Sequence, residues 1–148
     1  MAERVHASKL TWDEVVLRSP YPVEQDEFPE WNSGHRLPPE GHPCTDGERI
    51  YIPKQYQAAR RIQCFAHELG HAMLHYPNGY DLHLTDDDPP YASKLEYEAS
   101  LFGSALLRHF GVPDEVNEPY LDMYPGGADR ADHAAVDAAV AAAIQVFS

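Results

Sequence analysis

The longest amphipathic pattern in the chain runs from residue 54 to residue 76. Apolar side chains recur there at spacings of three and four residues, and Pro77, Asn78 and Gly79 follow directly. This spacing matches one face of an α-helix, and the proline and glycine end it. We therefore predict a helix over 54–76. Its buried stripe comprises Ala58, Ile62, Phe65, Leu69, Ala72 and Tyr76.

Two more helices are predicted downstream. Residues 93–110 repeat the apolar spacing, and Gly111 and Pro113 supply a stop signal after them. Residues 128–147 are so rich in alanine that helix propensity alone predicts a C-terminal helix. The buried stripe of the 93–110 helix comprises Leu95, Ala99, Phe102 and Leu106.

The N-terminal third has weaker patterns. "TWDE", beginning at Thr11, has the form of a capping box and predicts a short helix that ends before Pro20. Residues 19–48 contain six prolines and predict a long loop, which could cover a cleft. "RIYIP" at 49–53 predicts a strand, and its proline indicates an edge strand or a strand end.

Composition and charge narrow the class of protein. The chain has 148 residues, 43% of them hydrophobic, and residues 1–148 are expected to form one domain. Its net charge of −13 argues against nucleic acid as a direct partner and against anionic membranes. We find no apolar run near the ~20 residues of a membrane span, no signal-peptide pattern and no paired-cysteine motif. A cytoplasmic location is the expectation.

The sequence "HELGHAMLH" at 67–75 carries the candidate chemistry. His67 and His71 are four residues apart, so both imidazoles leave one face of the predicted helix and can bind a single ion. Glu68 lies beside them and can act as general base toward a metal-bound water. His75 is expected to make an interhelical or helix-end hydrogen bond, and Cys64 to be a buried thiol. Incidental histidines on a structural helix are the alternative.

A catalytic zinc usually takes three protein ligands, so a third must come from elsewhere. The 93–110 helix offers Glu96 and Glu98, which lie roughly 200° apart around its axis, so only one can face the metal. The apolar stripe does not choose between them. Glu96 has a second interpretation, because "SKLE" could be a capping box in which Glu96 bonds back to Ser93.

"AHELGHAMLH" followed by "LEYEASLFGSALL" resembles the ImmA/IrrE family of zinc metallopeptidases over about residues 58–107. The resemblance implies a zincin-like α+β fold, mostly helical, with a small sheet near the active-site helix. It also implies one Zn²⁺ per chain, held by His67, His71 and Glu96, with Glu68 as the catalytic base. Two residues depart from the family pattern. Ser100 stands where asparagine is usual, four residues after the ligand glutamate, and Gly103 stands where alanine is usual.

The implied activity is cleavage of a protein substrate, and the family suggests a Xre-type transcriptional repressor cut in the cytoplasm. Ser100 and His75 are candidates for hydrogen bonds to the ligands. His83, Tyr80 and Tyr91, between the two motif helices, are candidates to stabilise the oxyanion. A different class of function is also possible: a metal-stabilised interaction module that sequesters a regulator without proteolysis.

Overall fold

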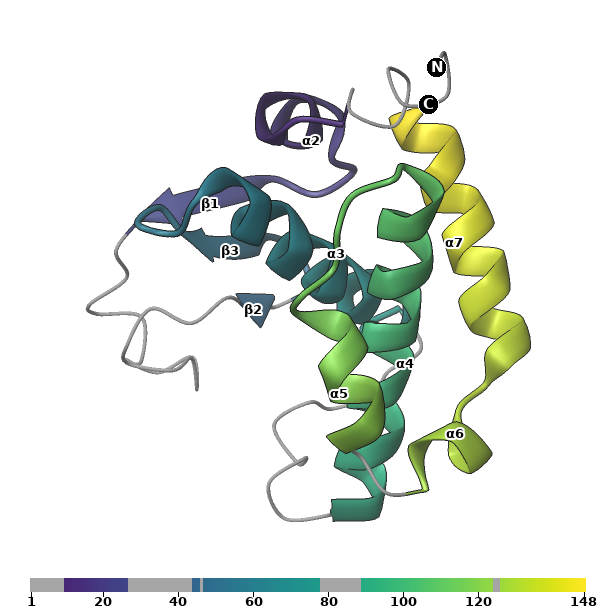
Figure 1. The fold of residues 1–148 in the computed structure, drawn as a ribbon. Helices are drawn as coiled ribbons and strands as arrows, with labels where there is room; N and C mark the ends of the chain where they lie inside the picture. Colours follow the sequence, from purple (N-terminus) through teal and green to yellow (C-terminus); the bar gives the residue numbers. More distant parts are fainter. Residues whose placement is uncertain (1–9, 27–43, 46, 78–88, 124–125) are drawn as a thin grey trace.

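Helices make up most of the structure, with one small sheet beside them (Figure 1). The computed structural model describes residues 10–26, 44–45, 47–77, 89–123 and 126–148. This architecture confirms the expected α+β class. The helices are α2 (Trp12–Arg18), α3 (Ala58–Leu74), α4 (Pro89–His109), α5 (Asn117–Met123), α6 (Gly127–Arg130) and α7 (His133–Phe147), and the strands are β1 (Val23–Asp26), β2 (Cys44–Thr45) and β3 (Ile50–Pro53).

The sheet has the strand order β1-β3-β2. β1 runs parallel to β3, with Val23 opposite Ile50, and β2 runs antiparallel to it, with Thr45 opposite the same residue. β3 is therefore central and every residue of it is buried, so the expectation of an edge strand was wrong. Pro53 is the last residue of the strand, as the second alternative predicted. Its lack of a backbone N–H is tolerated there because no strand residue follows it.

The predicted loop at 19–48 contains both outer strands, which is a second correction. β1 reads Val-Glu-Gln-Asp and has no strong strand pattern of its own. Pairing with β3 and the hydrogen bond from Trp12 Nε1 to Gln25 Oε1 (2.7 Å) hold it in place. The Tyr76 hydroxyl similarly donates to the carbonyl oxygen of Thr45 in β2 (2.8 Å). Tertiary partners, rather than local propensity, make these strands. Residues 27–43 lie outside the described part of the chain.

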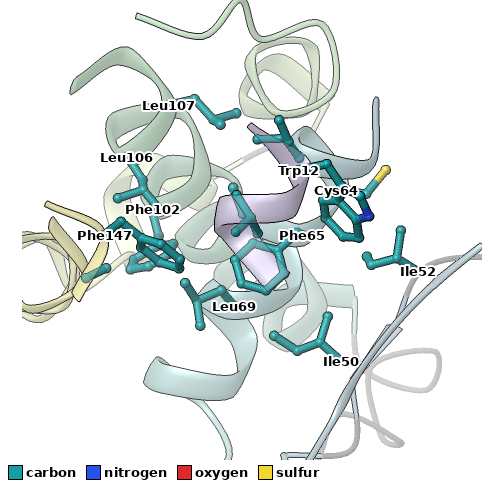
Figure 2. Close-up of a cluster of buried hydrophobic side chains, with 14 of the residues drawn as sticks. Trp12, Ile50, Ile52, Cys64, Phe65, Leu69, Phe102, Leu106, Leu107 and Phe147 are labelled. Carbon is teal, nitrogen blue, oxygen red and sulfur yellow. The ribbon is translucent and has the colours of Figure 1, made fainter. Parts of the chain in front are cut away.

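The hydrophobic core surrounds α3. Phe65 packs edge-on against Trp12 of α2 and Phe147 of α7, with ring centroids 6.3 and 6.0 Å apart (Figure 2). The central four positions of the predicted stripe are buried, whereas Ala58 is exposed and Tyr76 is half-buried. All four stripe residues predicted on α4 are buried as well. Among the described residues, no helix combines the length and the apolar character needed to cross a membrane.

The ends of the motif helices differ modestly from prediction. α3 begins at Ala58 rather than residue 54, because the preceding residues form a turn. Arg61 fastens that turn by donating to the carbonyl oxygens of Tyr56 (2.6 Å) and Lys54 (2.8 Å). α4 ends where Gly111 adopts a left-handed φ of 71°, which confirms the predicted stop.

The alanine-rich segment is two helices rather than one. α6 ends at Arg130 and α7 begins at His133. Asp132 caps α7, because its side chain accepts a hydrogen bond from the backbone N–H of Ala135 (3.0 Å). Its own backbone N–H donates to Glu98 of α4 (2.7 Å). The hydrogen bonds of Asp132 thus favour a break between α6 and α7, despite the high helix propensity of the alanines around it.

Gly70 brings α3 and α4 close together. A Cβ atom at this position would lie 3.1 Å from both the Cα and the carbonyl oxygen of Ala99, and 3.1 Å from the Phe102 ring. The backbone that approaches Gly70 so closely is therefore that of α4.

We expect Gly70→Ala to lower the free energy of unfolding by about 1–3 kcal/mol, because α4 would have to move. Alanine would otherwise stabilise a helix interior by about 1 kcal/mol. Urea unfolding measures the net effect, with Ala138→Gly at an exposed position of α7 as the measure of helix propensity in this protein. A Gly70→Ala protein more stable than the wild type would show that the helices are not in tight contact here.

Candidate metal centre

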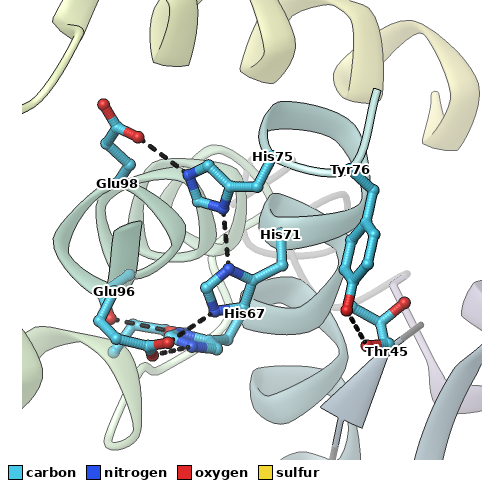
Figure 3. Close-up of polar contacts among 9 residues, drawn as sticks. Thr45, His67, His71, His75, Tyr76, Glu96 and Glu98 are labelled. Atoms are coloured by element: carbon cyan, nitrogen blue, oxygen red, sulfur yellow. Dashed lines mark hydrogen bonds and ion pairs between the residues drawn. The ribbon is translucent and has the colours of Figure 1, made fainter. Parts of the chain in front are cut away.

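Three candidate ligands meet between α3 and α4. His67 and His71 come from α3 and Glu96 from α4, and their ligand atoms all lie within 4.8 Å of one another. His67 Nε2 is 3.0 Å from Glu96 Oε1, and His71 Nε2 is 3.1 Å from Glu96 Oε2 (Figure 3). Two imidazole nitrogens and a carboxylate are donors that catalytic zinc sites use. The structure thus brings Glu96, rather than Glu98, to the histidine pair.

The capping-box interpretation of Glu96 is wrong. α4 begins at Pro89, so Ser93 lies inside the helix and cannot be its N-cap. The Glu96 side chain points across to the histidines of α3 instead (Figure 3).

Glu98 has a different histidine partner. Its Oε1 is 2.9 Å from Nε2 of His75, and His75 Nδ1 is 2.8 Å from Nδ1 of His71 (Figure 3). An ionised carboxylate only accepts hydrogen bonds, so His75 carries its proton on Nε2 and accepts through Nδ1. His71 then donates its Nδ1–H to His75, and its Nε2 is the atom that faces Glu96. His75 thus makes the interhelical hydrogen bond expected of it.

The Glu98 carboxylate is itself firmly held. Lys94 Nζ donates to Glu98 Oε2 (2.6 Å), as does the backbone N–H of Asp132 before α7 (2.7 Å). Burial would raise the pKa of Glu98, but the hydrogen bonds from His75, Asp132 and Lys94 lower it to about 2. Burial in turn lowers the pKa of His75 to about 4, against the opposing effect of Glu98. At neutral pH Glu98 is therefore an anion and His75 a neutral imidazole, in the hydrogen-bonded chain that runs from Glu98 through His75 to His71.

His67 has two partners on its Nδ1 side. The Asn117 Oδ1 atom lies 3.1 Å from His67 Nδ1, and the Ser100 Oγ atom lies 3.2 Å from it. Ser100, a candidate from the sequence, is thus in contact with the histidine and fully buried. Asn117 was not anticipated, because it lies fifty residues from His67, outside both motifs. Only the folded position of α5 reveals it.

A cleft of about 810 Å³ opens over this cluster. Glu68 lines it as well, and it is close enough to His67, His71 and Glu96 for their charges to shift its pKa. The walls come from the turn before α3, from α3 itself, from Glu96 of α4 and from the segment that leads into α5. The residues lining the cleft include Tyr56, Arg60, Cys64, His67, Glu96 and Val116.

Electrostatics separate the roles of the acidic groups. Burial raises the pKa of Glu68, and the positive charges of His67 and His71 only partly oppose this. Burial would also raise the pKa of Glu96, but the charges and hydrogen bonds of the two histidines hold it well below its usual range. Burial would lower the pKa of His67, but its bond to Glu96 and the nearby charges raise it to about 9. In the metal-free cluster Glu96 is therefore the anion and His67 holds a proton.

Cys64 is a buried free thiol in the cleft wall. Burial and the neighbouring Glu68 charge raise its pKa to about 12, so it stays protonated. A protonated thiol is a poor metal ligand. This agrees with its interpretation as a small core residue.

The three oxyanion candidates receive no structural test. His83 and Tyr80 lie outside the described residues, and the described part of Tyr91 is limited to its backbone in α4. Their role stays a prediction.

The sequence model of the IrrE N-terminal-like domain, peptidase family M78, matches residues 15–115. The chain belongs to the ImmA/IrrE metallopeptidase family. The match covers more than half of the chain and includes both α3 and α4 in full. No curated protein and no solved structure matches the chain significantly. The ImmA/IrrE assignment makes the chain a metallopeptidase and makes the cluster of His67, His71 and Glu96 its candidate zinc site.

Proposed function

We propose that this ImmA/IrrE protein is a zinc-dependent endopeptidase that cleaves a regulatory protein in the cytoplasm. The observation that supports it best is the convergence of His67, His71 and Glu96, together with a cleft that His67, Glu96 and Glu68 line. The residues fit zinc, because both imidazoles turn Nε2 toward Glu96 and each has its other nitrogen occupied by a hydrogen-bond partner. One Zn²⁺ per chain would be held by these three residues.

When bound, zinc supplies Lewis-acid activation of a peptide carbonyl group and of water. Glu68 is the group of this chain that would accept a proton from the attacking water and return it to the departing amine. Its raised pKa suits that exchange, since a weakly acidic carboxyl group both takes up and releases a proton more readily near neutral pH. Ser100, Asn117 and the pair of His75 and Glu98 would keep the imidazoles oriented.

The family implies a protein substrate, and the resemblance suggests a Xre-type transcriptional repressor. The cleft of about 810 Å³, lined by three separate segments of the chain, is where a peptide segment of the substrate would bind. A regulatory peptidase is expected to cut the repressor at one site.

The test is to purify the protein, measure its native metal content and incubate it with a Xre-type repressor. We expect about one zinc per chain and a single pair of repressor fragments by mass spectrometry. Chelation should stop cleavage, and added zinc should restore it. Loss of repressor function with the repressor intact would favour the sequestering module. If the purified protein contained no stoichiometric metal, the result would favour the alternative in which the histidines are incidental residues of a structural helix.

The raised pKa of His67 predicts that zinc binding depends on pH. A ligand imidazole must be deprotonated, so at a pH below about 9 zinc has to displace the His67 proton. The apparent zinc affinity should then fall about tenfold for each pH unit below that value. Competition with a chelating indicator, corrected for the indicator's own protonation, measures the slope between pH 7 and 9. A flat profile across this range would mean that His67 is already neutral in the metal-free protein.

A further inference from the structure

We infer that Asn117 is a positioning residue for His67, delivered to the centre from α5, and that Gly103 of α4 leaves the space for it. The inference rests on the proposed zinc site. It concerns how one ligand of that site is aimed, and it adds α5 to the elements that build the centre.

The orientation of the Asn117 amide is fixed by its neighbours. Its Nδ2 donates to the carbonyl oxygen of Gln63 (3.3 Å) and to Asp114 Oδ1 (3.2 Å), both of which can only accept. The Oδ1 atom is therefore the one that faces His67 Nδ1, at 3.1 Å. Asn117 is fully buried, so this contact is not shared with solvent.

An amide oxygen decides which nitrogen of His67 keeps its proton when a metal binds. Because Asn117 Oδ1 can only accept, it requires an N–H at Nδ1 and leaves Nε2, which faces Glu96, as the nitrogen that can give up its proton to zinc. Ser100 cannot make this choice. Its hydroxyl, 3.2 Å from the same nitrogen, can rotate to donate or to accept and so suits either tautomer.

Gly103 provides the space for this arrangement. A Cβ atom at position 103 would lie 2.9 Å from Cγ and Nδ2 of Asn117, which is too close for the two to coexist without a shift. Gly103, on α4, thus leaves the space that the Asn117 amide, delivered from α5, occupies. Asn117 lies just beyond the family match, which ends at residue 115.

The chain offers a matched control for the experiment. Gln63 also fastens the segment before α5 to α3, because its Nε2 donates to the carbonyl oxygen of Pro113 (2.7 Å) and its Oε1 accepts from the backbone N–H of Glu115 (3.4 Å). These bonds do not involve the His67 ring. Gln63→Ala therefore loosens the segment while the amide of Asn117 stays beside the histidine.

The experiment compares zinc dissociation constants of the wild type, Asn117→Ala and Gln63→Ala by competition with a chelator. We expect Asn117→Ala to bind zinc about 10- to 100-fold more weakly, the usual cost of losing a partner of a metal ligand. Gln63→Ala should stay within about threefold of the wild type, since it keeps that partner. Equal weakening in the two variants, or an unchanged Asn117→Ala, would overturn the inference.

A rescue variant separates orientation from packing. In Ser100→Asn/Asn117→Ala an amide from α4 can occupy the space vacated on α5, because Ser100 Oγ already lies within hydrogen-bond distance of His67. We expect this double variant to recover most of the lost zinc affinity. A double variant that binds zinc no better than Asn117→Ala would show that the position of the amide on α5, and not its contact with His67, matters.

A measurement on the unaltered protein avoids any folding defect. In the zinc-loaded wild type, the His67 Nδ1 proton should be visible by NMR and protected from exchange with solvent. An absent or rapidly exchanging proton would contradict the inference while leaving zinc binding itself intact. Failure of the wild type to bind zinc would instead remove the proposed function, and the inference with it.

Discussion

Replacing Glu68 with glutamine is expected to lower the rate of repressor cleavage by about 10²- to 10⁴-fold, the usual contribution of a general base. Glutamine keeps the shape of the side chain but cannot accept the proton of the attacking water. Zinc content should not change, because Glu68 is not one of the three clustered ligand candidates. The fold should tolerate the change, because burial already raises the pKa of this carboxyl toward its neutral form.

The measurement is a time course of repressor fragments, with zinc content determined on the same samples. Glu118→Gln, at an exposed position of α5, is the matched control for loss of one negative charge. It should cleave at the wild-type rate. A Glu68→Gln protein that still inactivates the repressor as well as the wild type, with no fragments in either case, would favour sequestration over proteolysis.

The part of the site that lies on one helix was predictable from sequence. A spacing of four residues fixes the relation of His67 to His71 whatever the rest of the chain does. The same logic indicated that Glu68 would lie beside them. Helix periodicity also identified the buried stripes of α3 and α4, because burial of an apolar face needs no knowledge of its partner.

The choice between Glu96 and Glu98 could not be made from spacing. It depends on the rotation of α4 against α3, which is set by tight contact between Gly70 and Ala99. Both carboxylates reach histidines of α3: Glu96 lies against the ligand pair, and Glu98 lies against His75. The family resemblance pointed to Glu96, because a family motif reflects a shared fold and therefore the rotation of this helix.

Long-range pairing accounts for what the sequence did not predict. β1 and β2 became strands through their partner β3, and their own residues were interpreted as loop. The break before α7 follows from Asp132, which binds Glu98 far away in the sequence. Asn117 could not be identified from sequence, since its contact with His67 depends on the position of α5 and on the space that Gly103 leaves for it.

Glu96→Gln is expected to act mainly on zinc affinity, whereas Glu98→Gln is expected to act mainly on the stability of the fold. Glu96→Gln should weaken zinc binding by at least about 100-fold, beyond the cost of losing a partner of a ligand, because a neutral amide replaces an anionic ligand. Glu98→Gln should lower the free energy of unfolding by about 3–5 kcal/mol, because a buried carboxylate with three partners is lost. Chelator competition and urea unfolding, each applied to both variants, make the comparison.

Glu98→Gln should also weaken zinc binding, by about tenfold, since His75 would no longer fix the tautomer of His71. The ranking of the two variants is therefore the informative result. If Glu98→Gln lost more zinc affinity than Glu96→Gln, Glu98 would be the ligand and the rotation of α4 would differ from that in Figure 3. If Glu96→Gln lost more stability, the ion pair with His67 would be mainly structural. Only the expected order makes Glu96 the metal ligand and Glu98 the support for His75, which in turn holds the ligand His71.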